Sequence, residues 1–391
     1  MKKITYLAVL LVLLSAACIP AAQAQPNAVP TTASLPTATI APLPTATSAP
    51  LPTATTAAMP TAGTMSPQTF TVLVGLDDKA TGAAIDAYFP ATIHVHVGDT
   101  VVWKKNSNEI HTVTFLGSMA KAPDLLVPMP NAPQGAMMVN PQAGFPTLPK
   151  DGVYDGTAFA NSGIIGPDQG QAQQFSLTFT KAGSYSYTCV VHGVEDMTGT
   201  VVVDDASMSV PSQADDDAQA KTEMDTLMAK IPNIAQAATA EIPANVANSD
   251  GSTNHFVLVG YTDGQIDLDF FFPQKLQVNP GDTVTWVFSK QDVAPHTITF
   301  LNGATAPAPI KAVPQAGGMP LLTFDPFVAM PQNADKPLTD KGVFSSGILD
   351  PTAPGPHQFT LKIGNYIGTL KYQCILHDDL GMIGTLTVVK K

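Results

Sequence analysis

The sequence contains no arginine, and all 19 of its positively charged residues are lysines. Acidic residues number 31, so the formal net charge is −12. Arginine is the side chain best suited to forked contacts with phosphates and base edges, and an acidic protein repels a polyanion. We therefore expect no nucleic-acid partner.

Charged residues of either sign are also scarce, at 13% of the 391 residues, whereas 35 residues are proline. Globular proteins usually carry about 25% charged residues. The many prolines favour turns, loops and linkers over long helices. At about 100–200 residues per domain, the length predicts two domains and additional segments.

The first 24 residues have the pattern of a secretory signal. Two lysines precede an apolar run over residues 4–17, and small residues follow. This run is too short for a membrane span, which needs about 20 apolar residues. Ser15-Ala16-Ala17-Cys18 resembles the lipobox of bacterial lipoproteins, so we predict lipidation of Cys18. The alternative is simple cleavage after Ala24.

Residues 25–67 are dominated by proline, threonine and alanine, and the phrase Leu-Pro-Thr-Ala-Thr occurs three times. A segment of this composition cannot bury a core, and its prolines keep it extended. We predict a disordered stalk that holds the folded part away from a membrane or wall.

The folded part is one unit written twice. Four residue identities recur 185 positions apart. The pairs are His111 and His296, Cys189 and Cys374, His192 and His377, and Met197 and Met382. A Phe-Pro pair and a Gly-Asp-Thr-Val segment also occur in both copies, at 89–90 and 98–101 and again at 272–273 and 281–284. A constant spacing across an otherwise diverged stretch indicates a duplicated domain. We place domain 1 at 68–205 and domain 2 at 253–391.

Each copy is predicted to be all-β. Short runs rich in β-branched and aromatic residues are bounded by glycine, proline and aspartate. About seven or eight strands per copy suit a Greek-key β-sandwich. In copy 1 we expect strands at 70–74, 93–97, 100–103, 111–115, 175–179, 184–189 and 199–203. In copy 2 we expect them at 256–259, 276–278, 283–288, 297–301, 359–363, 369–374 and 384–389. The linker 206–252 is predicted to hold a helix at 214–231 that lies on one domain.

A metal explains why an exported protein keeps an unpaired cysteine in each copy. Each cysteine begins the pattern Cys-x2-His-x4-Met, and a further histidine lies 78 residues upstream. One thiolate, two imidazoles and a weak thioether are the donor set of blue copper. The candidate copper ligands are His111, Cys189, His192 and Met197 in copy 1, and His296, Cys374, His377 and Met382 in copy 2.

At these residues both copies resemble cupredoxins, with ligand spacing like that of plastocyanin and pseudoazurin. Val97-Gly98-Asp99-Thr100-Val101 and its counterpart at 280–284 match the family's strand-turn-strand before the first ligand. The resemblance implies one type 1 copper per domain and single-electron transfer. It implies cysteine thiolates that couple to copper, axial methionines that tune the potential, and second histidines near the surface where electrons enter and leave. Thr112 and Thr297 depart from the family, which often has asparagine after the first histidine.

Other functions remain open on the same residues. Zinc and a thiol nucleophile fit less well, because neither gives the repeated methionine a role. Loop methionines suggest copper delivery or storage as the alternative; they are Met129, Met137, Met138, Met319 and Met330. A two-domain copper oxidase or nitrite reductase would need a catalytic copper, for which only His94-Val95-His96 offers a His-x-His element. We interpret these two histidines as a solvated strand face, and we expect no enzyme.

The remaining expectations concern location and partners. We expect an extracytoplasmic protein, either anchored to the outer face of the cell membrane or secreted or periplasmic. Redox proteins would be its donors and acceptors, met transiently through a small patch. The chain itself is expected to be a monomer.

Overall fold

The computed structural model describes residues 66–130, 136–167, 171–193, 196–316, 318–353 and 355–390. The predicted signal segment, Cys18 and almost all of the predicted stalk lie outside these residues. No helix within the described ranges is both long enough and apolar enough to cross a membrane.

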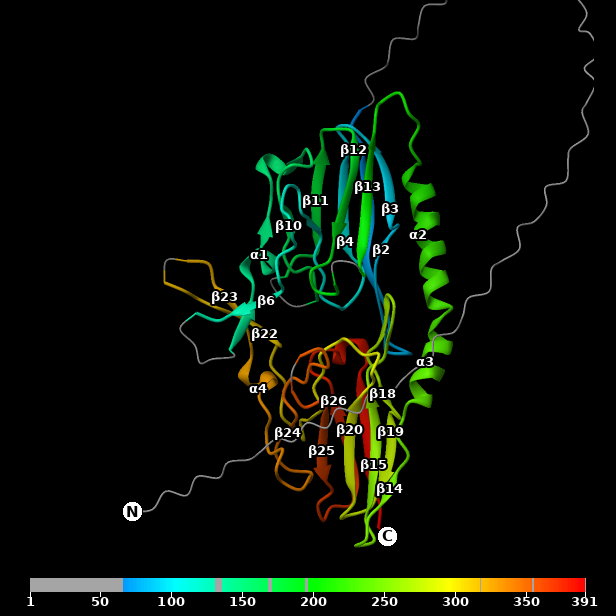
Figure 1. Cartoon of the computed structure of the whole chain (residues 1–391), viewed down its shortest axis with the longest axis vertical. Coiled ribbons are helices and arrows are strands. Elements are labelled where there is room, and N and C mark those ends of the chain that lie inside the picture. Colours follow the sequence, from blue (N-terminus) through cyan, green and yellow to red (C-terminus); the bar gives the residue numbers. More distant parts are fainter. Residues whose placement is uncertain are drawn as a thin grey trace, which may run out of the picture. The chain divides into compact units, whose positions relative to one another are not determined.

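The first copy is a sandwich of two sheets, in which sequence neighbours are often separated in space (Figure 1). One sheet has the order β16-β17-β2-β1-β4-β11-β9 and the other β3-β13-β12-β5-β10-β8. The strands of this copy are β1 (Thr69–Asp78), β2 (Ala83–Phe89), β3 (Thr92–His96), β4 (Thr100–Lys105), β5 (Thr114–Phe115), β8 (Pro146–Thr147), β9 (Val153–Tyr154), β10 (Ala160–Ser162), β11 (Gln174–Phe179), β12 (Gly183–Thr188) and β13 (Thr198–Asp204). A short helix α1 (Pro141–Gly144) and the 3-10 turn η1 (Lys150–Gly152) lie between them.

The second copy repeats this plan with sheets β14-β15-β20-β25 and β19-β27-β26-β21-β24. Its strands are β14 (Val246–Ala247), β15 (Thr253–Val259), β16 (Thr262–Asp263), β17 (Ile266–Leu268), β18 (Phe271–Phe272), β19 (Lys275–Val278), β20 (Thr283–Phe288), β21 (Thr299–Phe300), β24 (Phe344–Ser345), β25 (Gln358–Lys362), β26 (Gly368–Gln373) and β27 (Ile383–Val388). It also contains α4 (Pro326–Ala329) and η2 (Asp378–Leu380).

Each sandwich closes over its own aromatic core. Trp103 in copy 1 and Trp286 in copy 2 are fully buried at equivalent positions. Each indole contacts a tyrosine and a phenylalanine edge-on: Trp103 contacts Tyr187 and Phe115, and Trp286 contacts Tyr372 and Phe300. Burying rings of this size supplies much of the apolar area that stabilises a domain. The predicted all-β sandwich in duplicate is confirmed.

The linker forms two helices, α2 (Gln213–Met228) and α3 (Ile231–Ala240), where one was expected. Ser212 caps α2 in a reciprocal hydrogen-bonded box with Asp215. Such a box satisfies two backbone donors at the start of a helix. The apolar side chains of both helices join residues of both copies in a shared core. The helical linker is therefore confirmed, but its helices pack on both domains.

Two further strand pairings join the copies. Strand β17 of copy 2 pairs with β2 of copy 1, aligning Ile266 with Ile85. The long segments before each cysteine form a separate sheet, β22-β23-β7-β6. Its strands are β6 (Leu126–Pro128), β7 (Met137–Val139), β22 (Ile310–Val313) and β23 (Leu321–Phe324). The two copies thus share one continuous sheet and one small antiparallel sheet that takes two strands from each.

Candidate metal centres

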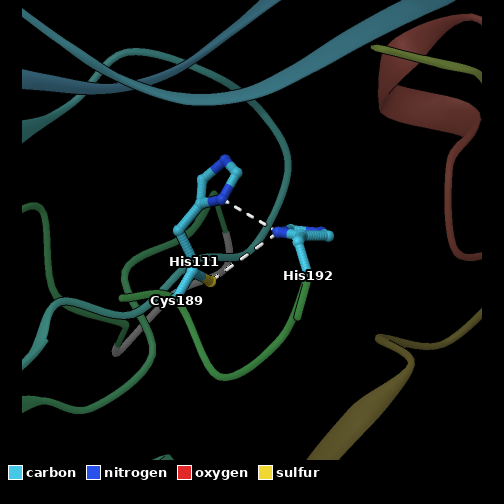
Figure 2. Close-up of side chains that lie close together, drawn as sticks. All are labelled: His111, Cys189 and His192. Carbon is cyan, nitrogen blue, oxygen red and sulfur yellow. Dashed lines mark hydrogen bonds between the residues drawn. The ribbon is translucent and has the colours of Figure 1, made fainter. Parts of the chain in front are cut away.

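Three side chains converge at one end of the first sandwich (Figure 2). His111 lies just before β5 and is held by reciprocal backbone hydrogen bonds of 2.8 Å with Ile165. Cys189 follows directly after β12, and His192 lies on the loop beyond it. The ladder between β12 and β5 brings the two distant segments together at Thr188 and Thr114.

The Nδ1 atoms of both histidines face the cysteine sulfur. His111 Nδ1 lies 3.1 Å from His192 Nδ1, and the latter lies 3.7 Å from Cys189 Sγ. One ligand atom from each residue lies within 4.8 Å of the others. His111 and Cys189 are almost wholly buried. This is a compact two-nitrogen, one-sulfur donor set.

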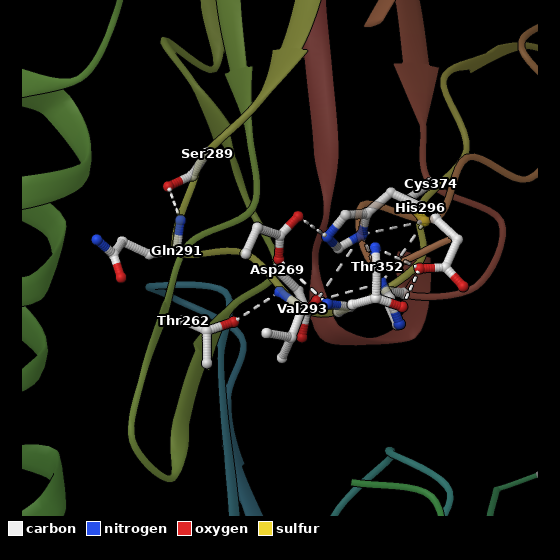
Figure 3. Close-up of polar contacts among 12 residues, drawn as sticks. Thr262, Asp269, Ser289, Gln291, Val293, His296, Thr352 and Cys374 are labelled. Atoms are coloured by element: carbon white, nitrogen blue, oxygen red, sulfur yellow. Dashed lines mark hydrogen bonds and ion pairs between the residues drawn. The ribbon is translucent and has the colours of Figure 1, made fainter. Parts of the chain in front are cut away.

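The second copy has the same arrangement (Figure 3). His296 Nδ1 lies 2.9 Å from His377 Nδ1, and Cys374 Sγ lies 3.8 Å and 3.6 Å from these two nitrogens. All three residues are buried. Among the described residues, these two groups are the only ones of their kind.

Thr112 and Thr297, which depart from the family pattern, hold the ligand loops in place. The Thr112 hydroxyl accepts a 2.9 Å hydrogen bond from the backbone N–H of Val190, and its own N–H lies 3.3 Å from Cys189 Sγ. Thr297 repeats both contacts with Ile375 and Cys374, at 2.8 Å and 3.3 Å. N–H donors aimed at sulfur favour a thiolate, the form that binds metals.

The candidate axial methionines are fixed beside the cysteines. The Cys189 N–H donates to the Met197 carbonyl at 3.0 Å, and the Cys374 N–H donates to that of Met382 at 3.1 Å. Both methionine side chains are fully buried in the same core clusters as the cysteines. Each copy thus places two histidines, a cysteine and a methionine in one buried region, and these residue types fit copper.

The electrostatics of the sites favour thiolates. Burial opposes ionisation of Cys189 and Cys374, but the flanking histidines hold the pKa of each thiol well below its usual range. Burial also lowers the pKa of His111. Burial alone would lower the pKa of His377 as well, but Asp269 and the Cys374 thiolate raise it to about 10. A ligand thiol that is ionised without the metal needs less reorganisation when the metal binds.

Two buried carboxylates lie next to the second histidines, and neither is predicted from the sequence. Asp86 Oδ1 lies 3.6 Å from His192 Nδ1, and Asp269 Oδ1 lies 3.2 Å from His377 Nδ1. Burial raises the pKa of Asp86 to about 6 and that of Asp269 to about 7. A signal was present, because each aspartate stands four positions before the repeated Phe-Pro proline, Pro90 or Pro273.

The second histidines differ in exposure: 15% of the His192 side chain is exposed, whereas His377 is buried, contrary to the expectation for that residue. The His377 residue is only 6% exposed. His192 and His377 both line a cavity of about 610 Å³ together with Asp86, Glu109, Asp267 and Asp269. Residues of both copies line this cavity, so each second histidine faces side chains of the other copy as well as of its own.

The other histidines and methionines named above take different positions. His94 Nδ1 lies 2.9 Å from Asp204 Oδ2, and His96 Nε2 lies 2.9 Å from the Met208 carbonyl oxygen. His96 is buried, so the expectation of a fully solvated pair is wrong for it. Of the loop methionines, Met138 is buried, and Met137, Met319 and Met330 are exposed.

A glycine in each copy leaves room for the first histidine. Gly75 has φ +71°, and a Cβ there would lie 2.4 Å from His111 Nε2 and 2.5 Å from Ser107 Oγ. We expect Gly75→Ala to displace the imidazole and weaken copper binding at the first site about 10- to 100-fold, as loss of a supporting contact does. Competition with a chelator measures the affinity of each site.

Gly98→Ala is the matched control, because Gly98 also has positive φ, +98°, but no atom within 4 Å of its added Cβ. It should cost about 1 kcal/mol of stability through backbone strain and leave copper affinity unchanged. Equal losses of copper from both variants would show that strain, rather than contact with His111, controls the site.

Comparisons with known proteins give one family match and several similar solved structures. A family model of copper binding proteins, the plastocyanin/azurin family, matches residues 77–204. An oxidised amicyanin variant is 23% identical over 35% of this chain and 82% of that chain, with a TM-score of 0.21. Another amicyanin variant, in its Cu(I) form, is 24% identical over 37% of this chain and 89% of that chain, with a TM-score of 0.21. The comparison with curated proteins finds no match.

The family match spans the β2 strand, His111 and the complete ligand loop of copy 1. The resemblance to cupredoxins inferred from the repeated motifs is thereby confirmed. Residues 77–204 of the first copy are similar to the plastocyanin/azurin family of copper binding proteins, and the second copy carries the same pattern of histidine, cysteine and methionine.

Proposed function

We propose that this protein is an electron carrier with one type 1 copper in each copy. The observation that carries the proposal is the duplicated group of two histidine nitrogens and one cysteine sulfur within 4.8 Å, buried in a cupredoxin-type sandwich. His111, Cys189, His192 and Met197 would hold one ion, and His296, Cys374, His377 and Met382 the other. Copper in such a set supplies reversible one-electron chemistry.

The protein's own contribution is to keep the donors still. The ladder between β12 and β5 and the Thr112 hydroxyl fix the first loop, and the equivalent contacts of Thr297 fix the second. Donors that do not move between oxidation states keep the cost of reorganisation low. Burial excludes water and other ligands that would compete for the ion.

We further propose that the protein acts outside the cytoplasm as a monomer, held to the membrane through Cys18 or released after cleavage. Its partners would be redox proteins that bind transiently, and it would catalyse no reaction of its own. An unpaired thiol in each copy, kept in a chain with an export-type leader, supports this location.

Metal analysis with an absorption spectrum and a redox titration of the purified protein tests this function. We expect two coppers per chain, an intense visible band, and reversible one-electron reduction at both sites. Turnover with oxygen, nitrite or phenols would indicate an oxidase or reductase instead. Rapid release of Cu(I) to a chelator, with extra ions bound near Met137, Met319 and Met330, would indicate copper delivery.

A further inference from the structure

The free edges of the two second histidines face the same side chain. Because the Nδ1 atoms of His192 and His377 are directed toward sulfur, their Nε2 atoms are directed away from it. Glu109 Oε2 lies 3.8 Å from His192 Nε2, and Glu109 Oε1 lies 3.6 Å from His377 Nε2. One carboxylate therefore spans from one candidate copper site to the other, with one oxygen at each.

Glu109 is placed for this by the sequence around it. It stands two residues before His111, on the loop after β4, and it is 8% exposed. The position 185 residues later is Ala294. The duplication thus kept the ligands in both copies but left a glutamate in only one, as a single link between two sites requires.

The sheet that joins the copies keeps both histidines close to Glu109. Besides the pairing of β17 with β2, the Asp86 N–H donates a 2.9 Å hydrogen bond to the Gln265 carbonyl. The shared core with α2 and α3 packs against the same strands. The approach of His192 to His377 therefore rests on backbone pairing and a buried core rather than on a surface contact.

We infer that Glu109 bridges the two candidate copper sites and would provide the path for single-electron transfer between them, an inference that rests on the proposed function. With copper bound at both sites, a Cu(I) centre would pass one electron to the Cu(II) centre of the other copy, so that the two would exchange oxidation states. No proton, oxidant or further reactant is consumed. Electron transfer across non-bonded gaps slows steeply with distance, and here the gaps are only 3.6 and 3.8 Å.

The bridge also accounts for the position of the cavity that His192, His377 and Glu109 line. The second histidines, which in a single-domain carrier would meet a partner, here meet the other copy. An electron delivered to one centre by a donor could then pass to the second centre within the same chain. The chain would then store two electrons and equilibrate them internally.

Pulse reduction of the copper-loaded full chain tests the bridge. After a photochemical reductant delivers less than one electron per chain, the wild-type protein should show a relaxation between the centres whose rate is independent of protein concentration. Glu109→Ala should slow this phase at least about tenfold, because loss of positioned contacts on this scale commonly costs that much. Glu109→Gln keeps the shape of the side chain and should retain more of the rate than Glu109→Ala.

Asp267→Ala is the matched control, because Asp267 is also buried and lines the same cavity. Unlike Glu109, it is not among the carboxylates paired with the Nε2 atoms of the two histidines. It should leave the rate within about twofold, since it removes a charge but not the bridge. Cys374→Ser, which removes one centre, should abolish the phase. An equal rate in wild type and Glu109→Ala, with two coppers bound in each, would overturn the bridge.

A second readout needs no copper. In the zinc-loaded protein, the Nε2–H protons of His192 and His377 should exchange slowly in nitrogen-edited NMR spectra and become exposed together in Glu109→Ala. Unchanged signals would overturn the contact itself. If both centres cycle reversibly but no internal phase occurs, the bridge alone is wrong. If the centres accept no electron, the electron-carrier function fails as well.

Discussion

Replacing Cys189 with serine should remove one copper and about half of the visible absorbance, because the thiolate is the donor that gives blue copper its colour. Cys374→Ser should do the same at the other site. The double variant should be colourless. Metal analysis and absorption spectra of the three proteins measure these effects.

The fold should survive the change, so the loss can be read as a loss of ligand. A serine hydroxyl at position 189 can still accept the N–H groups of Thr112 and Val191, which lie 3.3 Å and 3.4 Å from the sulfur. Comparable melting temperatures of the metal-free proteins would establish this. Unchanged absorbance in Cys189→Ser, with an intact fold, would show that the first site is assigned wrongly.

The second centre should have the lower reduction potential. His111 Nε2 lies 2.9 Å from the Ser107 hydroxyl, whereas His296 Nε2 lies 3.3 Å from a carboxylate oxygen of the equivalent residue, Asp292. A carboxylate behind a ligand histidine raises the basicity of the ligand and stabilises the more positive ion. In a buried site this charge should lower the potential by on the order of 50 mV or more.

Redox titration of the single-site variants separates the two centres. Cys189→Ser leaves the second centre and Cys374→Ser leaves the first. In the former background, Asp292→Asn should raise the potential, because it removes the negative charge and keeps the shape. Asp263→Asn, at an exposed position on β16, is the control for net charge and should have little effect. If the second centre has the lower potential, as predicted, electrons would move from it to the first centre. A higher potential at the second centre would contradict this prediction.

The positions of strands were predicted correctly where one face of the strand is buried and the other is exposed to solvent. β13 alternates between buried and more exposed residues, and the predicted strand at 199–203 lies within it. β2 was missed, because all seven of its residues are buried. Tyr88 packs in the core of copy 1, while Ile85 packs in the core shared with copy 2. A strand covered on both faces shows no alternation, and its alanines carry little β signal.

The site was predicted in part. A repeated spacing marks the ligand candidates, since it survives only where function needs the residues together. Asp86 and Asp269 stand far from the cysteine-containing loops in sequence, and Glu109, although only two residues before His111, has no counterpart in copy 2. Asp86 and Asp269 each approach a histidine of their own copy through the tertiary fold, whereas the approach of Glu109 to His377 is a contact between the copies that no spacing within a copy encodes.

The sequence by itself determined the duplication, the all-β fold and the histidine, cysteine and methionine candidates, because these depend on local patterning and on a repeat at constant spacing. Only the tertiary structure decided that the copies share a sheet, that the linker helices complete a common core, and that Glu109 stands between His192 and His377. These contacts join residues that are far apart in sequence, so they depend on the complementary shapes of the two folded copies and not on local sequence patterns.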